Sequence, residues 1–223
     1  MRFDVLTLFP EMIQSHCSYS IMKRAIDAGV ISVNTVNPRD FTLDKHKKVD
    51  DTPYGGGAGM VLMAQPYVDA YESVEKQENS ITIMLSPQGE PMCEKIVKEL
   101  AQYDQIVCLC GHYEGFDERI REIIKPREIS LGDFVLTGGE LPALCLIDAV
   151  SRKIEGTLGK IESAEDDSFS DGLLEYPQYT KPREYRGLRV PEVLLNGNHK
   201  EINEFRQSQR IERTKARRPD LLQ

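Results

Sequence analysis

Short apolar segments alternate with amphipathic helical segments along the first 153 residues, and this alternation restricts the possible folds more than any other feature. Five segments have the apolar pattern of strands: residues 3–9, 30–37, 80–86, 105–111 and 127–131. Five others have helical periodicity: residues 11–28, 65–77, 91–102, 117–124 and 140–153. Such alternation predicts an α/β domain with a mostly parallel sheet, which binds ligands beyond the carboxyl ends of its strands.

The composition is that of a globular protein with one or two domains. Of the 223 residues, 40% are hydrophobic and 29% are charged. No apolar run approaches the ~20 residues that span a bilayer, and the N-terminus does not resemble a signal peptide, so we expect a cytoplasmic protein without membrane association. The five cysteines are an odd number without metal-ligand spacing. They predict reduced thiols on buried strands and helices, and no metal site.

Charge is distributed unevenly along the chain. The net charge is −8, which by itself disfavours nucleic-acid binding. Residues 181–223, however, contain 11 Lys or Arg and 6 Asp or Glu, whereas residues 1–180 contain 17 and 30. This asymmetry predicts a basic binding surface in the C-terminal part. The alternative is an ordinary solvated helix.

The segment from Ser130 to Ala143 is the most informative about function. It has the pattern of a strand end, a turn at Gly138 and Gly139, and a helix opened by Glu140 and Pro142. Glycines allow a backbone to approach a ligand closely. The helix ends at Ser151-Arg152, and an acidic run, Glu165-Asp-Asp167, follows after a linker. A backbone turn that can hold a ligand, together with Arg152 and the carboxylate of Asp167 in a mobile linker, indicates catalysis on a bound cofactor. Taken alone, Arg152 or Asp167 would be an ordinary surface group.

Two further glycine-containing segments are candidate binding sites. Residues 50–59 lack the Gly-Lys-Ser/Thr of a nucleotide-binding P-loop, so they predict either a wall for a large substrate or a plain surface loop. Residues 111–115 leave a strand and enter a helix. Their amides could bind an adenine, a ribose or a carboxylate, and Glu114 could bind a cationic cofactor. The alternative for this segment is a helix-capping turn.

Several of these segments together resemble the bacterial tRNA (guanine-N1-)-methyltransferases, the TrmD family of knotted SPOUT methyltransferases. The resemblance covers nearly all 223 residues in order. The matching segments are Asp50-Asp-x-Pro-Tyr-Gly-Gly-Gly-x-Gly-Met60, Leu85-Ser-Pro-Gln-Gly89, Cys110-Gly-x-Tyr-Glu-Gly-x-Asp-Glu-Arg119, Gly132-Asp-Phe-Val-Leu-Thr-Gly-Gly-Glu-Leu-Pro142, Asp167-Ser-Phe169, Gly172-Leu-Leu174, Tyr179-Thr-x-Pro182 and Arg217-Arg-Pro219.

The resemblance implies a trefoil-knotted α/β domain over residues 1–158, a flexible linker or lid over 159–171, and a basic helical tRNA-binding domain over 172–223. It implies a homodimer with the active site at the subunit interface, and S-adenosylmethionine as methyl donor. The substrate would be the guanine immediately 3′ of the tRNA anticodon. An assisting Mg²⁺ ion is also implied, although the sequence shows no dense carboxylate cage to hold one.

The resemblance also assigns site residues. Asp167 corresponds to the general base, and Arg152 to the residue that stabilises charge on O6. The cofactor would contact Leu85, Ser86, Pro87, Gly111, Tyr113, Glu114, Ser130, Leu131, Gly132, Asp133, Phe134, Val135, Leu136, Gly138, Gly139 and Pro142. The tRNA would contact Asp50, Gly55, Gly59, Ser163 and Glu175.

The chain departs from the family pattern at Met84, His112, Glu175 and Gln178. The sequence leaves two other functions open: a related methyltransferase acting on rRNA or on ribose, and a non-catalytic RNA-binding protein that senses the cofactor. No Gly-x-Ser-x-Gly, Walker lysine or His-Glu-x-x-His pattern occurs, so acyl and phosphoryl transfer are disfavoured.

Overall fold

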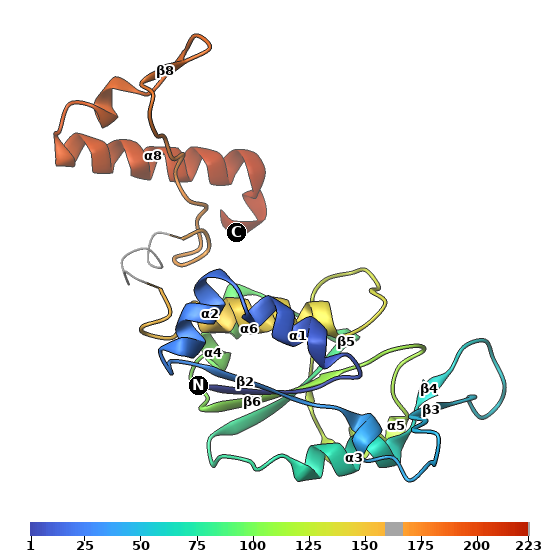
Figure 1. Ribbon diagram of the computed structural model, residues 1–223. Coiled ribbons are helices and arrows are strands. Elements are labelled where there is room, and N and C mark those ends of the chain that lie inside the picture. Colours follow the sequence, from blue (N-terminus) through green and yellow to red (C-terminus); the bar gives the residue numbers. More distant parts are fainter. Residues whose placement is uncertain (159–166, 223) are drawn as a thin grey trace. The chain divides into compact units, whose positions relative to one another are not determined.

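A computed structural model of the protein describes residues 1–158 and 167–222 (Figure 1). The chain divides into two compact units, Met1–Gly159 and Lys160–Gln223. The first unit contains the predicted strand and helix alternation, and the second contains the basic C-terminal segment.

A five-stranded parallel sheet forms the centre of the first unit. Its strands are β1 (Arg2–Leu6), β2 (Ser32–Val36), β5 (Ser80–Pro91), β6 (Gln105–Cys110) and β7 (Arg127–Ser130). Their order across the sheet is β2-β1-β6-β5-β7, and every neighbouring pair is parallel. The middle strand β6 is buried at all of its positions, which explains its continuous apolar sequence. The predicted parallel α/β sheet is confirmed.

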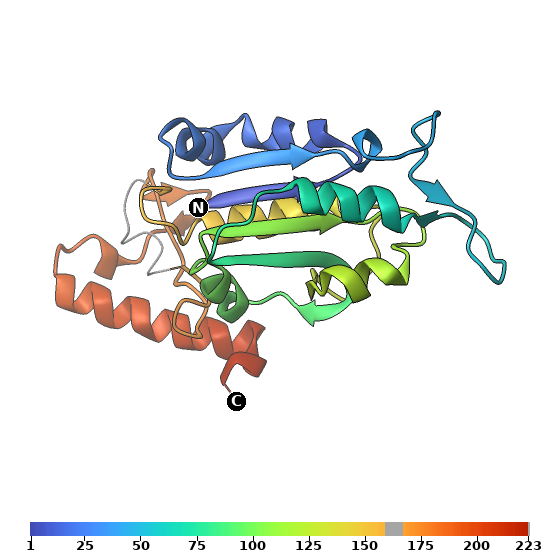
Figure 2. The same cartoon turned by 90° about the horizontal axis from the view of Figure 1, so that it is seen from below.

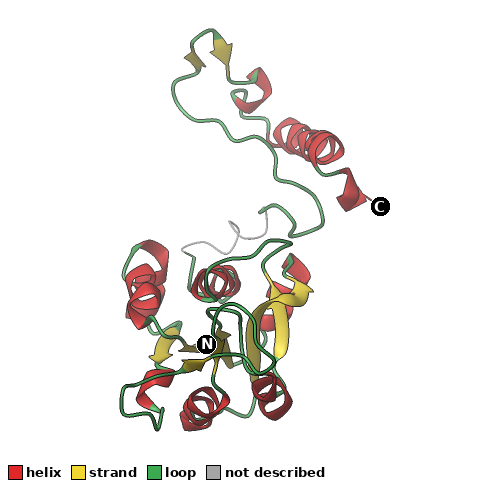
Figure 3. Cartoon of the chain, turned by 90° about the vertical axis from the view of Figure 1, so that its right-hand side faces the viewer, coloured by secondary structure: helices red, strands yellow, loops and turns green. Residues whose placement is uncertain are grey.

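Helices cover both faces of this sheet (Figures 1, 2 and 3). One face packs against α1 (Pro10–Cys17), α2 (Ser20–Asp27), α4 (Glu94–Leu100) and α6 (Glu140–Ser151). The other packs against α3 (Ala64–Ser73) and α5 (Glu118–Ile124). Because side chains alternate along a strand, Phe3 and Val5 face the first group of helices and Leu6 faces the second. The result is a three-layer domain with a hydrophobic core on each side of the sheet.

Two element boundaries differ from the sequence-based expectation. The helix expected over residues 11–28 is interrupted after Cys17, where Ser18 Oγ donates a hydrogen bond to the carbonyl of Gln14 at 2.7 Å. Serine side chains compete in this way with the helical backbone ladder. The turn expected at residues 87–90 is instead part of β5, whose pairing with β7 shifts register between Leu85 and Glu90.

Short elements complete the two units. The first unit also contains the 3-10 helix η1 (Pro38–Asp40) and a hairpin of β3 (Asp50–Asp51) and β4 (Val61–Leu62). The second contains the hairpin of β8 (Glu184–Tyr185) and β9 (Leu188–Arg189), η2 (Glu192–Leu194), α8 (His199–Arg217) and η3 (Pro219–Leu222). Among the residues that the structure describes, no helix has the length and apolar character needed to cross a bilayer.

Candidate cofactor pocket

A pocket of about 290 Å³ lies at the carboxyl ends of β5, β6 and β7. It is lined by the segments that follow these strands: residues 85–88, 111–116, 129–131 and 134–139, together with Arg121 and Pro142. The structure therefore brings together the predicted cofactor residues, except Gly132 and Asp133, which belong to the same loop but do not line the cavity. It adds Gln88, His112, Gly115, Phe116, Arg121, Ile129 and Thr137, which the sequence analysis did not include.

The glycine turn before α6 is packed tightly against the protein itself. A Cβ on Gly139 would lie 2.6 Å from the Cα of Cys110, and the Gly139 amide donates to the Gly111 carbonyl at 2.8 Å. A Cβ on Gly138 would lie 2.3 Å from Cε1 of His112. These glycines allow one chain segment to approach another, whereas the sequence analysis attributed them to close approach of a ligand.

The pocket has exposed apolar walls and backbone polar groups. Tyr113, Phe134 and Val135 are 50%, 56% and 81% exposed, although all three line a concave site. Exposed apolar side chains around a cavity with a few polar groups are typical of a small-molecule site. A flat base and a ribose suit such walls, and the carboxylate of Glu114 suits a positive charge. These residues therefore fit an S-adenosylmethionine molecule.

A buried carboxylate lies directly behind this pocket. Glu140, the first residue of α6, is 1% exposed. Its Oε1 accepts a hydrogen bond from Thr7 Oγ1, and its Oε2 pairs with His112 Nε2, both at 2.6 Å. From the sequence, Glu140 was predicted only to open a helix. Its burial could have been inferred from its position between two glycines and an otherwise apolar helix.

The loop between β3 and β4 is connected to the pocket at its base. The Glu114 amide donates to the Met60 carbonyl, and the Leu62 amide to the Gly115 carbonyl, both at 2.9 Å. Gly59 has a φ of +83°, and a Cβ there would lie 2.3 Å from Oε1 of Glu114. Gly55, by contrast, has open space around its Cα. The predicted substrate-contacting residues Asp50 and Gly59 thus lie on a hairpin that adjoins the cofactor pocket.

Arg152 lies away from the pocket within one copy of the chain. It follows Ser151 at the C-terminal end of α6, whose N-terminal end forms the pocket wall. Because α6 has 12 residues, it is about 18 Å long at 1.5 Å per residue. Asp167 and Glu175 belong to the second unit, and Ser163 lies outside the described residues. Within the first unit, the structure therefore does not bring Arg152 to the cofactor pocket.

The cysteines differ partly from expectation. Cys17, Cys108 and Cys110 are buried, whereas Cys93 and Cys145 are exposed, contrary to the prediction that all five are buried. Burial raises the pKa of the Cys108 thiol to about 12, and it raises the pKa of Cys110 well above its ordinary value. The two strand thiols are therefore neutral packing groups and not nucleophiles.

The basic residues of the second unit are partly used for packing. The guanidinium of Arg206 lies 4.6 Å from the ring centroid of Tyr176, and Arg210 pairs with Asp171 while its side chain is 12% exposed. Arg218 pairs with Asp220 at 2.7 Å. The C-terminal positive charge is thus in part structural, while Lys181, Arg183 and Arg186 are exposed and available to a ligand.

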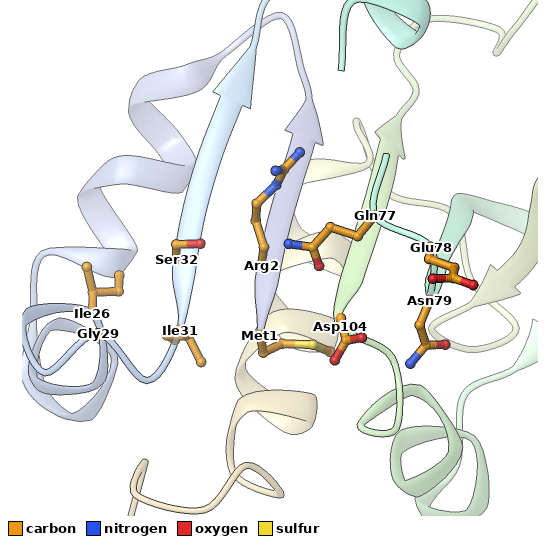
Figure 4. Close-up of a pocket in the computed structure, with 10 residues that line it drawn as sticks. All are labelled: Met1, Arg2, Ile26, Gly29, Ile31, Ser32, Gln77, Glu78, Asn79 and Asp104. Atoms are coloured by element: carbon orange, nitrogen blue, oxygen red, sulfur yellow. The ribbon is translucent and has the colours of Figure 1, made fainter. Parts of the chain in front are cut away.

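A second, larger cavity of about 860 Å³ lies at the other end of the strands, where their amino ends meet. Figure 4 shows its lining around the amino ends of β1, β2 and β6, with Arg2, Gln77 and Asp104 among the side chains. Ligands of parallel α/β sheets bind at carboxyl ends. We therefore assign the smaller pocket as the functional site. Among residues 1–158 and 167–222, no group of three or more His, Cys, Asp or Glu side chains has the arrangement of a metal site.

The parallel sheet and the pocket at its carboxyl edge define the class of the protein, an α/β fold with a pocket at the ends of its parallel strands. Comparison with known sequences identifies the family within this class. A sequence model of the family described as tRNA (Guanine-1)-methyltransferase TrmD matches residues 1–223. The chain belongs to this family, and it is accordingly a methyltransferase.

Named relatives extend this similarity over the whole chain. The chain is 54% identical over 223 residues to the tRNA (guanine-N(1)-)-methyltransferase of Staphylococcus epidermidis, covering 100% of this chain and 91% of that protein. It is 54% identical over 222 residues to the protein of the same name from Carboxydothermus hydrogenoformans, with 100% and 87% covered. The Staphylococcus aureus protein of this name is 53% identical over 223 residues, with 100% and 91% covered.

Proposed function

We propose that this chain methylates N1 of the guanine immediately 3′ of the anticodon, position 37 of tRNA, with S-adenosylmethionine as methyl donor. The observation that carries the proposal is the pocket at the carboxyl ends of β5, β6 and β7, in a chain that matches the TrmD family over its whole length. The names of the relatives support the choice of a tRNA guanine as substrate. We expect the enzyme to act in the cytoplasm.

The pocket residues bind and orient the methyl donor. When bound, S-adenosylmethionine supplies a methyl group activated by its sulfonium. The apolar walls formed by Leu85, Leu131 and Leu136 would enclose the adenosine, and Glu114 would attract the positive charge. The reaction needs no nucleophilic side chain, because N1 would attack the methyl carbon as its bond to sulfur breaks, with the neutral thioether as leaving group. Alignment of the methyl group with N1 would supply much of the acceleration.

The target atom requires a proton acceptor. N1 of neutral guanine carries a hydrogen and has no available lone pair, so its proton must leave as the N–C bond forms. We assign Asp167 as the general base that takes this proton. Arg152 stabilises the negative charge that develops on O6, because its planar guanidinium suits an oxyanion. Loss of a comparable electrostatic donor typically lowers the rate by ~10²–10³.

The site is shared between two copies of the chain in a homodimer. Support comes from α6, because Arg152 follows its last residue and lies about 15 Å along the helix from Pro142, the pocket residue nearest to it on this helix. A rigid helix cannot bring its two ends together. Arg152 therefore reaches the transferred methyl group only from the partner copy.

The tRNA extends from the first unit to the second. Residues 1–158 form the cofactor-binding domain, 159–171 a lid or linker, and 172–223 the basic tRNA-binding domain. The target guanosine contacts Asp50, Gly55, Gly59, Ser163 and Glu175, and exposed basic side chains of the second unit contact phosphates. Assistance by Mg²⁺ stays a prediction, because residues 1–158 and 167–222 contain no group of three or more His, Cys, Asp or Glu side chains that would hold the ion.

The sheet domain contains a trefoil knot. Support for the knot comes from the path of the chain. After the edge strand β7, the chain crosses β5 and reaches the end of β6. There, His112 and Gly138 form a bridge just before α6.

A single-turnover assay tests the proposed function. It uses S-adenosylmethionine labelled in the methyl group, an unmodified tRNA transcript with guanine at position 37, and wild type against Asp167→Ala. The expected result is labelled N1-methylguanine, formed at least 10²-fold more slowly by the variant. Label on another atom favours the rRNA or ribose alternative, and cofactor binding without any transfer favours the RNA-binding sensor. Equal rates would remove Asp167 from the mechanism.

A further inference from the structure

Glu140 connects three chain segments that meet behind the cofactor pocket. Its Oε1 accepts from Thr7 Oγ1, just after β1, and its Oε2 pairs with His112 Nε2, just after β6. Thr7 Oγ1 in turn accepts from the amide of Phe9 at 2.9 Å. A carboxylate that is 1% exposed is costly to bury, so a structure retains it only where hydrogen bonds compensate.

This network determines the tautomer of the histidine. A carboxylate only accepts hydrogen bonds, so both of its partners must donate. Thr7 donates through its hydroxyl and His112 through Nε2–H. In the neutral imidazole the other nitrogen, Nδ1, then carries a lone pair and is an acceptor. Within residues 1–158 and 167–222, no side chain or backbone group hydrogen-bonds to Nδ1.

The imidazole ring itself forms part of the pocket wall. His112 lines both the cofactor pocket and a small cavity of about 160 Å³. Its ring lies 4.8 Å from the ring of Phe9 and 6.1 Å from that of Tyr113, measured between centroids. Gly138 allows the ring to lie directly against the turn that precedes α6. The ring is therefore held in position by packing as well as by Glu140.

We propose that His112 is a cofactor-binding residue whose Nδ1 accepts a hydrogen bond from bound S-adenosylmethionine, and that Glu140 is the residue that positions it. The donor on the cofactor is a ribose hydroxyl, the adenine amino group or the α-ammonium group, each of which an imidazole acceptor suits. The inference rests on the proposed use of S-adenosylmethionine by this chain, and it extends that proposal to two residues with no assigned role.

Two variants distinguish the hydrogen-bond acceptor of His112 from the packing of its ring. His112→Phe keeps a planar ring against Gly138 but removes both nitrogens. Glu140→Gln keeps the side-chain volume, but its amide donates to Nε2 and so moves the imidazole proton to Nδ1. The control is Asp4→Asn, which changes another buried carboxylate, 4% exposed, on β1. There Asp4 accepts from Arg2, Asn34 and Gln105.

Calorimetric binding of S-adenosylhomocysteine to the full-length protein measures the effect. We expect His112→Phe and Glu140→Gln each to raise Kd by about 10-fold, the value of one hydrogen bond, and Asp4→Asn to leave Kd unchanged. Unchanged affinity in both site variants overturns the proposal. Failure of the wild type to bind contradicts the proposed function itself, and this inference with it.

Methylthioadenosine separates the donors of the nucleoside from the ammonium donor, because it retains the adenine and the ribose but lacks the amino-acid part. If the 10-fold loss persists with this ligand, the donor is a ribose hydroxyl or the adenine amino group. If the loss disappears, the donor is the ammonium group.

A further readout would not respond to a merely structural role. The nitrogen chemical shifts of His112 should show a proton on Nε2 in the wild type and on Nδ1 in Glu140→Gln. A proton on Nδ1 in the wild type contradicts the proposal.

Discussion

Arg152 and Gly139 stand at opposite ends of one helix, with the 12 residues of α6 between them. Gly139 belongs to the pocket wall, and Arg152 follows the last residue of the helix about 20 Å further along. The mechanism proposed above therefore draws the arginine and the pocket that act on one guanine from different chains.

Mixed dimers test that requirement. Arg152→Ala and Glu114→Lys are each expected to lower methyl transfer at least 10²-fold as pure proteins. If the site is shared, mixing them and allowing subunits to exchange restores about a quarter of wild-type activity, because half of the dimers have one intact site. The same proteins mixed without subunit exchange serve as the control. Absence of recovery, with exchange demonstrated by mass spectrometry, would place Arg152 and the pocket in one chain.

Gly59→Ala is expected to impair cofactor use because of its contact with Glu114. The new Cβ would stand 2.3 Å from Glu114 Oε1, at a φ of +83°. We predict a rise of about 10-fold in KM for S-adenosylmethionine. Gly29→Ala is the matched control, since Gly29 has a φ of +70° but no atom within 4 Å of the added Cβ. Both variants should lose about 1 kcal/mol of stability, but only the first should change KM. An equal change in KM would show that strain alone is responsible.

Thiol labelling of the native protein should be selective. Cys93 and Cys145 are exposed, whereas Cys17, Cys108 and Cys110 are buried. Burial also raises the pKa of the Cys108 thiol to about 12, so the reactive thiolate is scarce at pH 8. Peptide mapping after iodoacetamide treatment is expected to find the label on Cys93 and Cys145, with the other three labelled only after unfolding. Rapid native labelling of Cys108 would contradict the buried position of β6.

Asp171 should titrate below its ordinary range. A hydrogen bond from Arg210 lowers the pKa of the Asp171 carboxyl, and the amide of Leu173 lowers it further. Because the folded-state pKa is depressed, the pair stabilises the second unit above the unfolded value of 3.8, and this stabilisation is lost as the pH falls through the folded pKa. Carboxyl carbon shifts in an NMR titration measure the midpoint. Arg210→Gln should move it upward, and an unshifted midpoint in the wild type would exclude the ion pair in solution.

The sequence by itself determined the layered α/β architecture and which segments line the pocket at the carboxyl ends of the strands. Both depend on local patterns: apolar strands such as residues 105–110, amphipathic helices between them, and glycine-rich segments at strand ends. Periodicity fixes which side chains share a face, and parallel strands place their carboxyl ends at one edge. The family motifs added the chemistry, because methyl transfer to guanine has no local pattern that composition or spacing reveals.

Only the tertiary structure decided which distant groups meet. Thr7 and Glu140 are separated by 133 positions and form a hydrogen bond of 2.6 Å, and no periodicity in either segment predicts that contact. Gly139 is a second example of a long-range contact. The backbone of Cys110, and not a ligand, leaves no space for a Cβ at this position. Arg152 illustrates the reverse case, since it follows closely after the pocket residues in the sequence but lies a full helix away in space. Local sequence specifies dihedral angles and exposed faces, whereas long-range contacts depend on how all the layers pack at once.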